Sequence, residues 1–334
     1  MKNKFSIYKL HFTTPLHLGD ARNDYSISMK TVYSDTMYAA LTSCLAKIGK
    51  PIPDDGDLGF TISSLFPFYQ GENDPKAVYF FPKGFKKSKT NQSAIDELVT
   101  AKEIKQIQWI DLEYFEKRIN SNDNIYTDAN SFKDEYLTES KIEKDFITSE
   151  ISPRVTVPRS FEGDATPFYM DRLYFKGNSG LFFLVLGDTK LLDIAIDILQ
   201  YEGIGTDRNV GNGFFTFSKD EIALETPENS DYSMSLSLFI PESKEQLDEM
   251  LKGENASYDF VRRGGWVTTP PFNALRKSAI YAFIQGSVFM IENSSNVQIK
   301  GRMVDLKPEL PPDEQKLDHP IWRNGKALFI PVKI

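Results

Sequence analysis

The sequence predicts a mixed α+β protein of two domains, and three observations support this prediction. The chain of 334 residues is about twice as long as a typical single domain. Several short stretches alternate apolar and polar residues, which is typical of half-buried strands, whereas two longer stretches repeat apolar residues every three to four positions, as amphipathic helices do. Because 40% of the residues are apolar, the chain can fill two ordinary hydrophobic cores.

The first half of the chain alternates predicted strands with predicted helices. The alternation in Phe5–Phe12 predicts a strand, and Ser34–Ile48 predicts a helix that Ser34 or Asp35 can cap. Further strands are expected at 78–82, 154–157, 168–175, 181–186 and 214–217, and a second helix at 191–201. The order strand, helix, strands, helix, strand is that of a ferredoxin-like domain.

Residues 83–150 interrupt this order. The segment is rich in Lys, Asp, Glu, Asn and Ser and has only a weak helical pattern, so we expect an insertion that projects from the first domain. The alternative is a disordered loop. One apolar cluster within the segment requires burial, and we expect it to pack on the insertion's own base: Trp109, Ile110, Leu112, Tyr114 and Phe115.

The second domain follows an acidic linker that contains Pro227. We therefore expect the first domain to span residues 1–228 and the second to span residues 229–334. The later pattern predicts strands at 233–240, 258–267, 279–291 (two strands) and 327–332, with a short helix at 244–251. A second, smaller ferredoxin-like domain, with no repeat visible in the sequence, is the expected result.

Composition excludes several classes of site. The single cysteine, Cys44, cannot form an internal disulfide and is too little for a cysteine-based metal site. The N-terminal residues lack the uninterrupted apolar core of a signal peptide. No run of about 18 apolar residues occurs, so we expect no membrane span and a cytoplasmic protein. Nothing in the sequence predicts a metal or another cofactor.

The charge distribution bears on nucleic-acid binding. A net charge of −8 argues at first against a nucleic-acid partner. Residues 221–255, however, hold nine acidic and two basic side chains, whereas residues 256–304 hold six basic and two acidic ones. A basic face is therefore possible on an acidic protein.

The most informative segment is the glycine-rich stretch 203–213, Gly-Ile-Gly-Thr-Asp-Arg-Asn-Val-Gly-Asn-Gly. Glycines permit close backbone approach and positive φ, and exposed N–H groups in such a loop can bind phosphates. The order helix, loop, strand excludes a dinucleotide-binding fingerprint, and the absence of Gly-Lys-Ser/Thr excludes a P-loop. A purely structural turn is the alternative. The candidate phosphate contacts here, which the resemblance described below would make RNA contacts, are Gly203, Gly205, Thr206, Arg208, Asn209, Gly211 and Gly213.

Several motifs in this order resemble one family. The stretch from Thr14 to Gly19 (Thr-Pro-Leu-His-Leu-Gly) and Tyr33–Met37 resemble the start of RAMP proteins, the ferredoxin-like RNA-binding family of CRISPR systems. The loop 203–213 is similar to that family's glycine-rich loop, although it has Thr206-Asp207 where RAMP loops often carry a glycine and then a basic or small residue. An inward-pointing Asp207 would repel a phosphate. In the second half, four motifs resemble the RAMP subfamily of the type III-A (Csm) complex that binds the 5′ handle of the guide RNA: 261–267, 285–289, 301–308 and 319–327.

The resemblance implies a non-catalytic subunit in antiviral defence. Such a subunit binds the single-stranded 5′ handle of the crRNA and target RNA near it. It also joins the large polymerase/cyclase-like signalling subunit to the backbone RAMP subunits. The insertion would be a thumb that wedges into the guide–target duplex. Beyond the glycine loop, the expected RNA contacts are His17, Gly19, Ser34, Arg154, Arg159, Arg262, Arg263, Gly264, Gly265 and Trp266.

Two other functions remain open. A RAMP-type endoribonuclease that processes CRISPR precursor RNA would need a general acid and base, and His17 is the lone candidate among the three histidines. A non-catalytic role for His17 is favoured, and the histidines lack the spacing of metal ligands. A scaffold that touches no RNA would suit the acidic net charge. Trp266 can equally be a core anchor, and one of Arg154 and Arg159 can form a surface ion pair.

Overall fold

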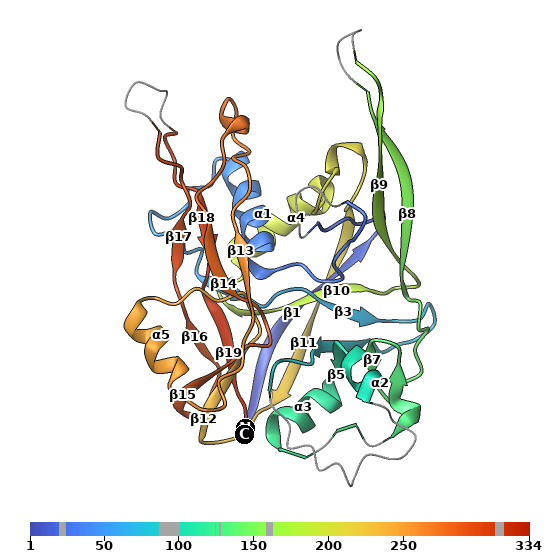
Figure 1. Ribbon diagram of the computed structural model, residues 1–334, viewed down its shortest axis with the longest axis vertical. Helices are drawn as coiled ribbons and strands as arrows, with labels where there is room; N and C mark the ends of the chain where they lie inside the picture. Colours follow the sequence, from blue (N-terminus) through green and yellow to red (C-terminus); the bar gives the residue numbers. More distant parts are fainter. Residues whose placement is uncertain (20–24, 87–100, 124, 127, 158–162, 311–316) are drawn as a thin grey trace.

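The fold is built on two main β-sheets that lie side by side (Figure 1). The computed structural model describes residues 1–19, 25–86, 101–123, 125–126, 128–157, 163–310 and 317–334. The larger sheet has nine strands, with β2 paired to β10 beside the path β11–β1–β10–β3–β4–β5–β7–β6. Its strands are β1 (Lys2–Phe12), β2 (Phe60–Ile62), β3 (Phe66–Tyr69), β4 (Val78–Pro82), β5 (Trp109–Asp111), β6 (Phe132–Lys133), β7 (Tyr136–Leu137), β10 (Gly180–Gly187) and β11 (Phe215–Glu225).

Two helices complete the first half, α1 (Ser34–Lys47) and α4 (Lys190–Glu202). Each buries one apolar face in the core of the larger sheet, with Leu41 and Cys44 from α1 and Ile196 and Leu199 from α4. Helix α1 ends where Gly49 takes a positive φ of 72°, a backbone conformation that glycine adopts without strain. The predicted order of strand, helix, strands, helix and strand is confirmed here.

Most of the described part of the segment 83–150 continues the larger sheet, and only its last residues, 147–150, enter a projecting element. Strand β5 pairs with β4, opposing Ile110 to Phe81, and so continues the sheet. The rings of Phe81 and Phe115 stack with centroids 4.5 Å apart, and Trp109 packs 6.0 Å from Phe66. The expectation that the cluster 109–115 packs on the insertion's own base is therefore wrong, because its apolar side chains join the main core. Helices α2 (Ala101–Gln106) and α3 (Leu112–Asn120) belong to this extension, and residues 87–100 lie outside the described part.

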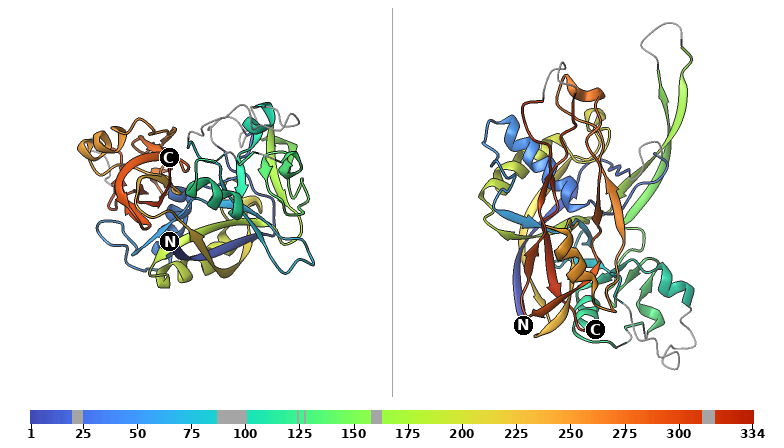
Figure 2. Two further views of the ribbon diagram at one scale, coloured as in Figure 1. Left: turned by 90° about the horizontal axis from the view of Figure 1, so that it is seen from below. Right: turned by 60° about the vertical axis from the view of Figure 1, so that its left-hand side comes forward.

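The element that projects is a hairpin, here called the arm, formed by β8 (Ile147–Thr156) and β9 (Thr166–Phe175) (Figures 1 and 2). The two strands pair from Ile147–Phe175 at the root to Thr156–Thr166 near the tip. Two backbone hydrogen bonds between Leu16 and Leu173, of 2.8 and 2.9 Å, hold the root against the segment that follows β1. Further out, Asp171 donates its N–H to the carbonyl of Tyr25 (2.7 Å), and the ring of Tyr25 lies 5.4 Å from that of Phe168.

The second half contains a four-stranded antiparallel sheet of order β15–β12–β19–β16. In the described residues beyond 228, α5 (Lys244–Leu251) is the one α-helix, and the strand order differs from that of the first sheet. The expected second ferredoxin-like domain, with two helices, is not confirmed. The strands are β12 (Ser230–Ser235), β15 (Val288–Ser294), β16 (Gln298–Lys300) and β19 (Ala327–Pro331), beside the pairs β13 (Phe260–Arg263) with β14 (Ile280–Phe283) and β17 (Met303–Asp305) with β18 (Trp322–Asn324).

A buried ion-pair network joins the two halves. Asp35, in the first turn of α1, is fully buried, and its carboxylate accepts hydrogen bonds from Arg263 on β13 (2.8 and 3.1 Å) and Arg323 on β18 (2.7 Å). Burial raises the pKa of the Asp35 carboxyl, but the charges of Arg323 and Arg263 outweigh burial and lower that pKa below its usual value. Apolar residues of both halves, such as Met37 and Leu236, also share one core.

Asp35→Asn should destabilise the protein by about 3–5 kcal/mol, because it leaves two buried guanidinium groups without their counter-charge. Chemical denaturation of the purified chain measures this loss. Asp145→Asn, which removes an exposed partner of Lys176, is the matched control and should leave the midpoint nearly unchanged. An equally stable Asp35→Asn protein would contradict the assigned role.

The same network predicts an acid transition. The folded-state pKa of Asp35 lies below its unfolded-state value of about 3.9. The stabilisation is therefore present above that unfolded-state pKa and is lost as pH falls through the folded-state pKa. In Asp35→Asn, this part of the acid dependence should be absent.

Candidate RNA interface

The glycine-rich loop 203–213 connects α4 to β11 and is built against the segment that follows β1. Gly213 donates its N–H to the carbonyl of Pro15 (2.7 Å), and Thr206 donates its N–H to the carbonyl of His17 (3.0 Å). Within the loop, Ile204 donates to the carbonyl of Gly213 (2.9 Å). The base of the loop is therefore closed on itself and fixed to the N-terminal segment.

Packing explains three of the four glycines. A Cβ at Gly213 would lie 1.9 Å from the carbonyl oxygen of Ile204, and one at Gly205 would lie 2.4 Å from that of His17. Gly203 is similarly restricted, by the carbonyl of Asn212 at 2.9 Å. The alternative of a structural turn therefore accounts for these three positions. At Gly211 a Cβ would meet nothing within 4 Å, so only its positive φ of 93° favours glycine there.

The tip of the loop is a single 3₁₀ turn, Arg208–Val210, which is exposed to solvent. The Arg208 guanidinium lies 3.5 Å from the carbonyl of Gly203, and no ion pair of Arg208 or Asp207 occurs within the described part of the chain. Asp207 takes a left-handed conformation (φ 58°), and its carbonyl accepts the N–H of Val210 (3.1 Å). The Arg208 guanidinium therefore lies at an exposed tip without an ion pair in the described residues, while the base of the loop is fixed.

His17 lies where the loop, the N-terminal segment and the arm meet. It is fully buried, and its Nδ1 donates to the carbonyl of Asp171 on β9 (2.7 Å), while its Nε2 has no hydrogen-bond partner among the described residues. The Asp171 carboxylate in turn accepts the N–H of Ser28 (2.8 Å) and the hydroxyl of Ser149. In this position the imidazole joins three segments and is closed off from solvent.

The remaining candidates of the first half are dispersed. Ser34 is buried, and its hydroxyl accepts the N–H of Leu238 (2.9 Å), so it joins the two halves. Gly19 is exposed beside His17, and Arg154 is half-buried on the arm. Arg159 lies outside the described residues.

In the second half, Arg262 and Arg263 point to opposite faces of β13. Arg263 is held by Asp35, and the carbonyl of Gly264 accepts a bond from Arg323 (3.1 Å). Gly265 is exposed with a φ of 107°, and the Arg276 guanidinium lies 5.1 Å from the ring centroid of the half-buried Trp266. Arg262 itself is exposed. The structure thus brings His17 to the glycine loop, whereas the 262–266 group lies on the other half, linked to α1 through Arg263.

The surroundings of Arg263 are cationic. Lys277 lies close to the Asp35 network, and burial together with Arg323 lowers the pKa of its ammonium to about 8. Arg263, Arg323 and Lys277 therefore share one carboxylate. The region at the base of β13 carries a positive excess, which suits a polyanion.

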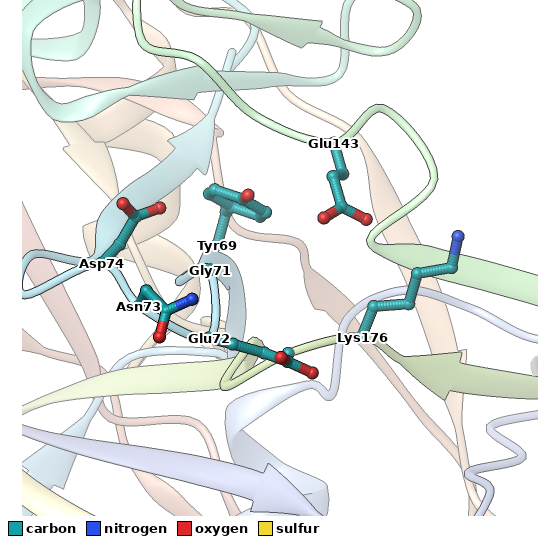
Figure 3. Close-up of a pocket in the computed structure, with 8 residues that line it drawn as sticks. Tyr69, Gly71, Glu72, Asn73, Asp74, Glu143 and Lys176 are labelled. Carbon is teal, nitrogen blue, oxygen red and sulfur yellow. The ribbon is translucent and has the colours of Figure 1, made fainter.

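A pocket at the root of the arm has the opposite character (Figure 3). It is lined by the carboxylates of Glu72, Asp74 and Glu143 against one lysine, Lys176, which itself pairs with Asp145. Such a lining repels phosphate. Within the described ranges, no group of three or more His, Cys, Asp or Glu is placed to hold a metal ion, and no helix there is long and apolar enough to cross a membrane.

The loop glycines yield a paired prediction. Gly213→Ala should destabilise the protein by more than the roughly 1–2 kcal/mol that a left-handed non-glycine residue costs, because its Cβ meets a carbonyl oxygen as well. Gly211→Ala should cost only about that conformational amount, since its surroundings are open. Thermal melts of both variants provide the measurement. Equal melting temperatures for the two would mean that the loop relaxes freely.

Comparison with known proteins agrees with this architecture. Residues 228–332 match the family model of the CRISPR Csm4 C-terminal domain. The chain is 25% identical over 345 residues to the CRISPR system Cms protein Csm4 of Streptococcus thermophilus, which covers 98% of this chain and 99% of that protein. It is 24% identical over 299 residues to the protein of the same name from Thermococcus onnurineus strain NA1, covering 83% of this chain and 92% of the relative.

Solved structures show the same fold. One is a chain of the Csm1–Csm4 cassette in complex with cA4, with 20% identity, a TM-score of 0.58 and coverage of 99% of both chains. Another is a chain of the Csm3–Csm4 subcomplex in the type III-A CRISPR-Cas interference complex, with 18% identity, a TM-score of 0.56 and coverage of 99% of this chain and 100% of the other. Residues 228–332 thus match the CRISPR Csm4 C-terminal domain, and the chain is similar along nearly its whole length to Csm4 proteins, which are RAMP proteins.

Proposed function

We propose that the protein is a non-catalytic crRNA-binding subunit that holds the 5′ handle of the guide RNA in a type III-A interference complex. The observation that carries the proposal is the glycine loop, whose base is fixed to the N-terminal segment while Arg208 at its tip is exposed and has no ion pair in the described part. Such a tip can bind a phosphate without first breaking an ion pair, since within the described residues the guanidinium makes only a long hydrogen bond to the carbonyl of Gly203. The loop would act together with the cationic base of β13.

Its proposed partners follow from the relatives. Csm4 chains occur in solved assemblies with Csm1 and with Csm3. We therefore propose that this chain links the large polymerase/cyclase-like signalling subunit to the backbone RAMP subunits, in the cytoplasm and in antiviral defence. The other proposed partners are the guide RNA and the target RNA near its 5′ handle.

The finer architecture is part of the proposal. The order β11–β1–β10–β3, with α1 and α4 between the strands in sequence, supports a ferredoxin-like first domain. The start of the family match at residue 228 supports a domain boundary there. The arm, rather than the segment 83–150, has the projecting shape that a thumb at the guide–target duplex requires (Figure 2).

The environment of the histidines supports a role without catalysis. His17 is fully buried, and its Nδ1 is occupied by the carbonyl of Asp171. His11 is partly buried, and burial lowers the pKa of its imidazole. His319 is exposed and lies 3.1 Å from the Thr269 hydroxyl. A general acid–base pair around an RNA 2′-hydroxyl would need two such groups at one accessible place.

Arg208→Ala should weaken binding of a repeat-derived handle RNA and reduce the slope of log affinity against log salt by about 0.7, the value for one phosphate contact on a single strand. Filter binding at several salt concentrations measures both quantities. Lys190→Ala, which removes one exposed charge at the other end of α4, is the matched control and should leave the slope unchanged. If Arg208→Ala behaves like that control, the tip does not bind phosphate.

The purified protein should leave repeat RNA intact, and His17→Ala should lower its thermal stability, because the buried imidazole holds the arm to the N-terminal segment. Gel analysis of repeat RNA incubated with both proteins makes the test. Site-specific cleavage that His17→Ala abolishes would establish the endoribonuclease instead. A wild-type protein that binds no RNA alone or in its complex would favour the scaffold.

A further inference from the structure

The strand pair β13–β14 exposes two aromatic rings that neither the fold nor the glycine loop explains. Phe260 is 55% exposed and Tyr281 is 63% exposed, and their ring centroids lie 5.7 Å apart in an edge-to-face arrangement. In the antiparallel register, Phe260 opposes Phe283 and Arg262 opposes Tyr281. Directly opposed residues share one face of a strand pair, so Phe260, Arg262 and Tyr281 present one surface.

The other face of the pair is closed by the protein. Val261 and Ile280 pack with Ala282 on a small core around Leu238 and Ile240. This packing fixes which face of β13–β14 points outward. At one end of the outward face, Phe283 is half-buried, with its ring centroid 5.1 Å from that of Phe289, so this end of the face is anchored to the core. The two exposed rings therefore stand on a supported sheet surface.

The charge of this surface is positive. Arg262 is exposed and makes no ion pair with any residue in the described ranges. Opposed pairs on the face include no acidic residue. The nearest acid in sequence, Asp259, uses its carboxylate to accept the N–H of Phe260 (2.8 Å).

From this arrangement we infer that the outer face of β13–β14 is a stacking platform for single-stranded RNA. Unpaired bases stack on the rings of Phe260 and Tyr281, and Arg262 binds a phosphate. Single-stranded RNA exposes apolar base faces and a charged backbone. The bases can stack on aromatic rings of adjacent β-strands, and the backbone can bind a neighbouring guanidinium. A protein partner would have to supply a carboxylate for Arg262, and that alternative is an outcome of the test. The inference deepens the proposed RNA-binding function and rests on it.

The test uses the full-length protein and two RNAs, an eight-nucleotide oligoadenylate and the repeat-derived handle RNA. The double variant Phe260→Ala/Tyr281→Ala should bind oligoadenylate about 5- to 150-fold more weakly for each base stack that is lost, with an unchanged salt slope. Arg262→Ala should instead reduce the salt slope by about 0.7. Ile299→Ala, which removes an exposed apolar side chain from β16, is the matched control and should change neither quantity.

Two further variants separate stacking from structure. Phe260→Tyr/Tyr281→Phe keeps both rings and should restore the affinity. Phe260→Trp places a fluorophore on the platform, and oligoadenylate should quench its emission relative to the wild-type protein.

Each outcome decides one proposal. Absence of quenching, with full affinity in the double alanine variant, overturns the platform but leaves handle binding through the glycine loop intact. Quenching by oligoadenylate in a protein that does not bind the handle RNA would support the platform and overturn the proposed function. Unchanged RNA affinity with lost assembly of the effector complex would assign the surface to a protein partner and overturn the inference.

Discussion

The buried carboxylate of Asp35 is the constraint on which the arrangement of the two halves depends. Burying three charged groups is costly, and the cost is offset only while both guanidinium groups stay in contact with the carboxylate. Because Arg263 and Arg323 lie on two different strand pairs, this requirement fixes β13 and β18 relative to the start of α1. Any surface built on those strands therefore has a defined position relative to the first half.

A second set of contacts does the same for the glycine loop. The carbonyls of Pro15 and His17 accept hydrogen bonds from backbone N–H groups of the loop, and the side chain of His17 donates a hydrogen bond to the arm. The segment that follows β1 is thus the shared support of two elements far apart in the sequence. The burial of His17 follows from its place between these elements.

The sequence predicts the locally determined elements well, because the spacing of apolar residues and the turn-forming residues determine them. Strand β1, helices α1 and α4 and the place of the glycine loop are confirmed. The expected packing of the cluster 109–115 on the insertion's own base was wrong, because strand β5 continues the larger sheet and brings the start of α3 into the main core. From the sequence, Asp35 is predicted only as a possible helix cap. Its partners Arg263 and Arg323 lie 228 and 288 residues away, so the ion pairs follow only from the tertiary fold. The contacts of the RNA-binding candidates stay predictions.

The arm has a mechanical consequence. A ten-residue antiparallel strand spans about 34 Å, so the hairpin reaches far beyond the surface that carries it. Its middle is bonded to His17 through Asp171, and the backbone of His17 is bonded to Thr206 of the glycine loop. Since one residue makes both contacts, we expect the arm and the base of the loop to move together rather than independently.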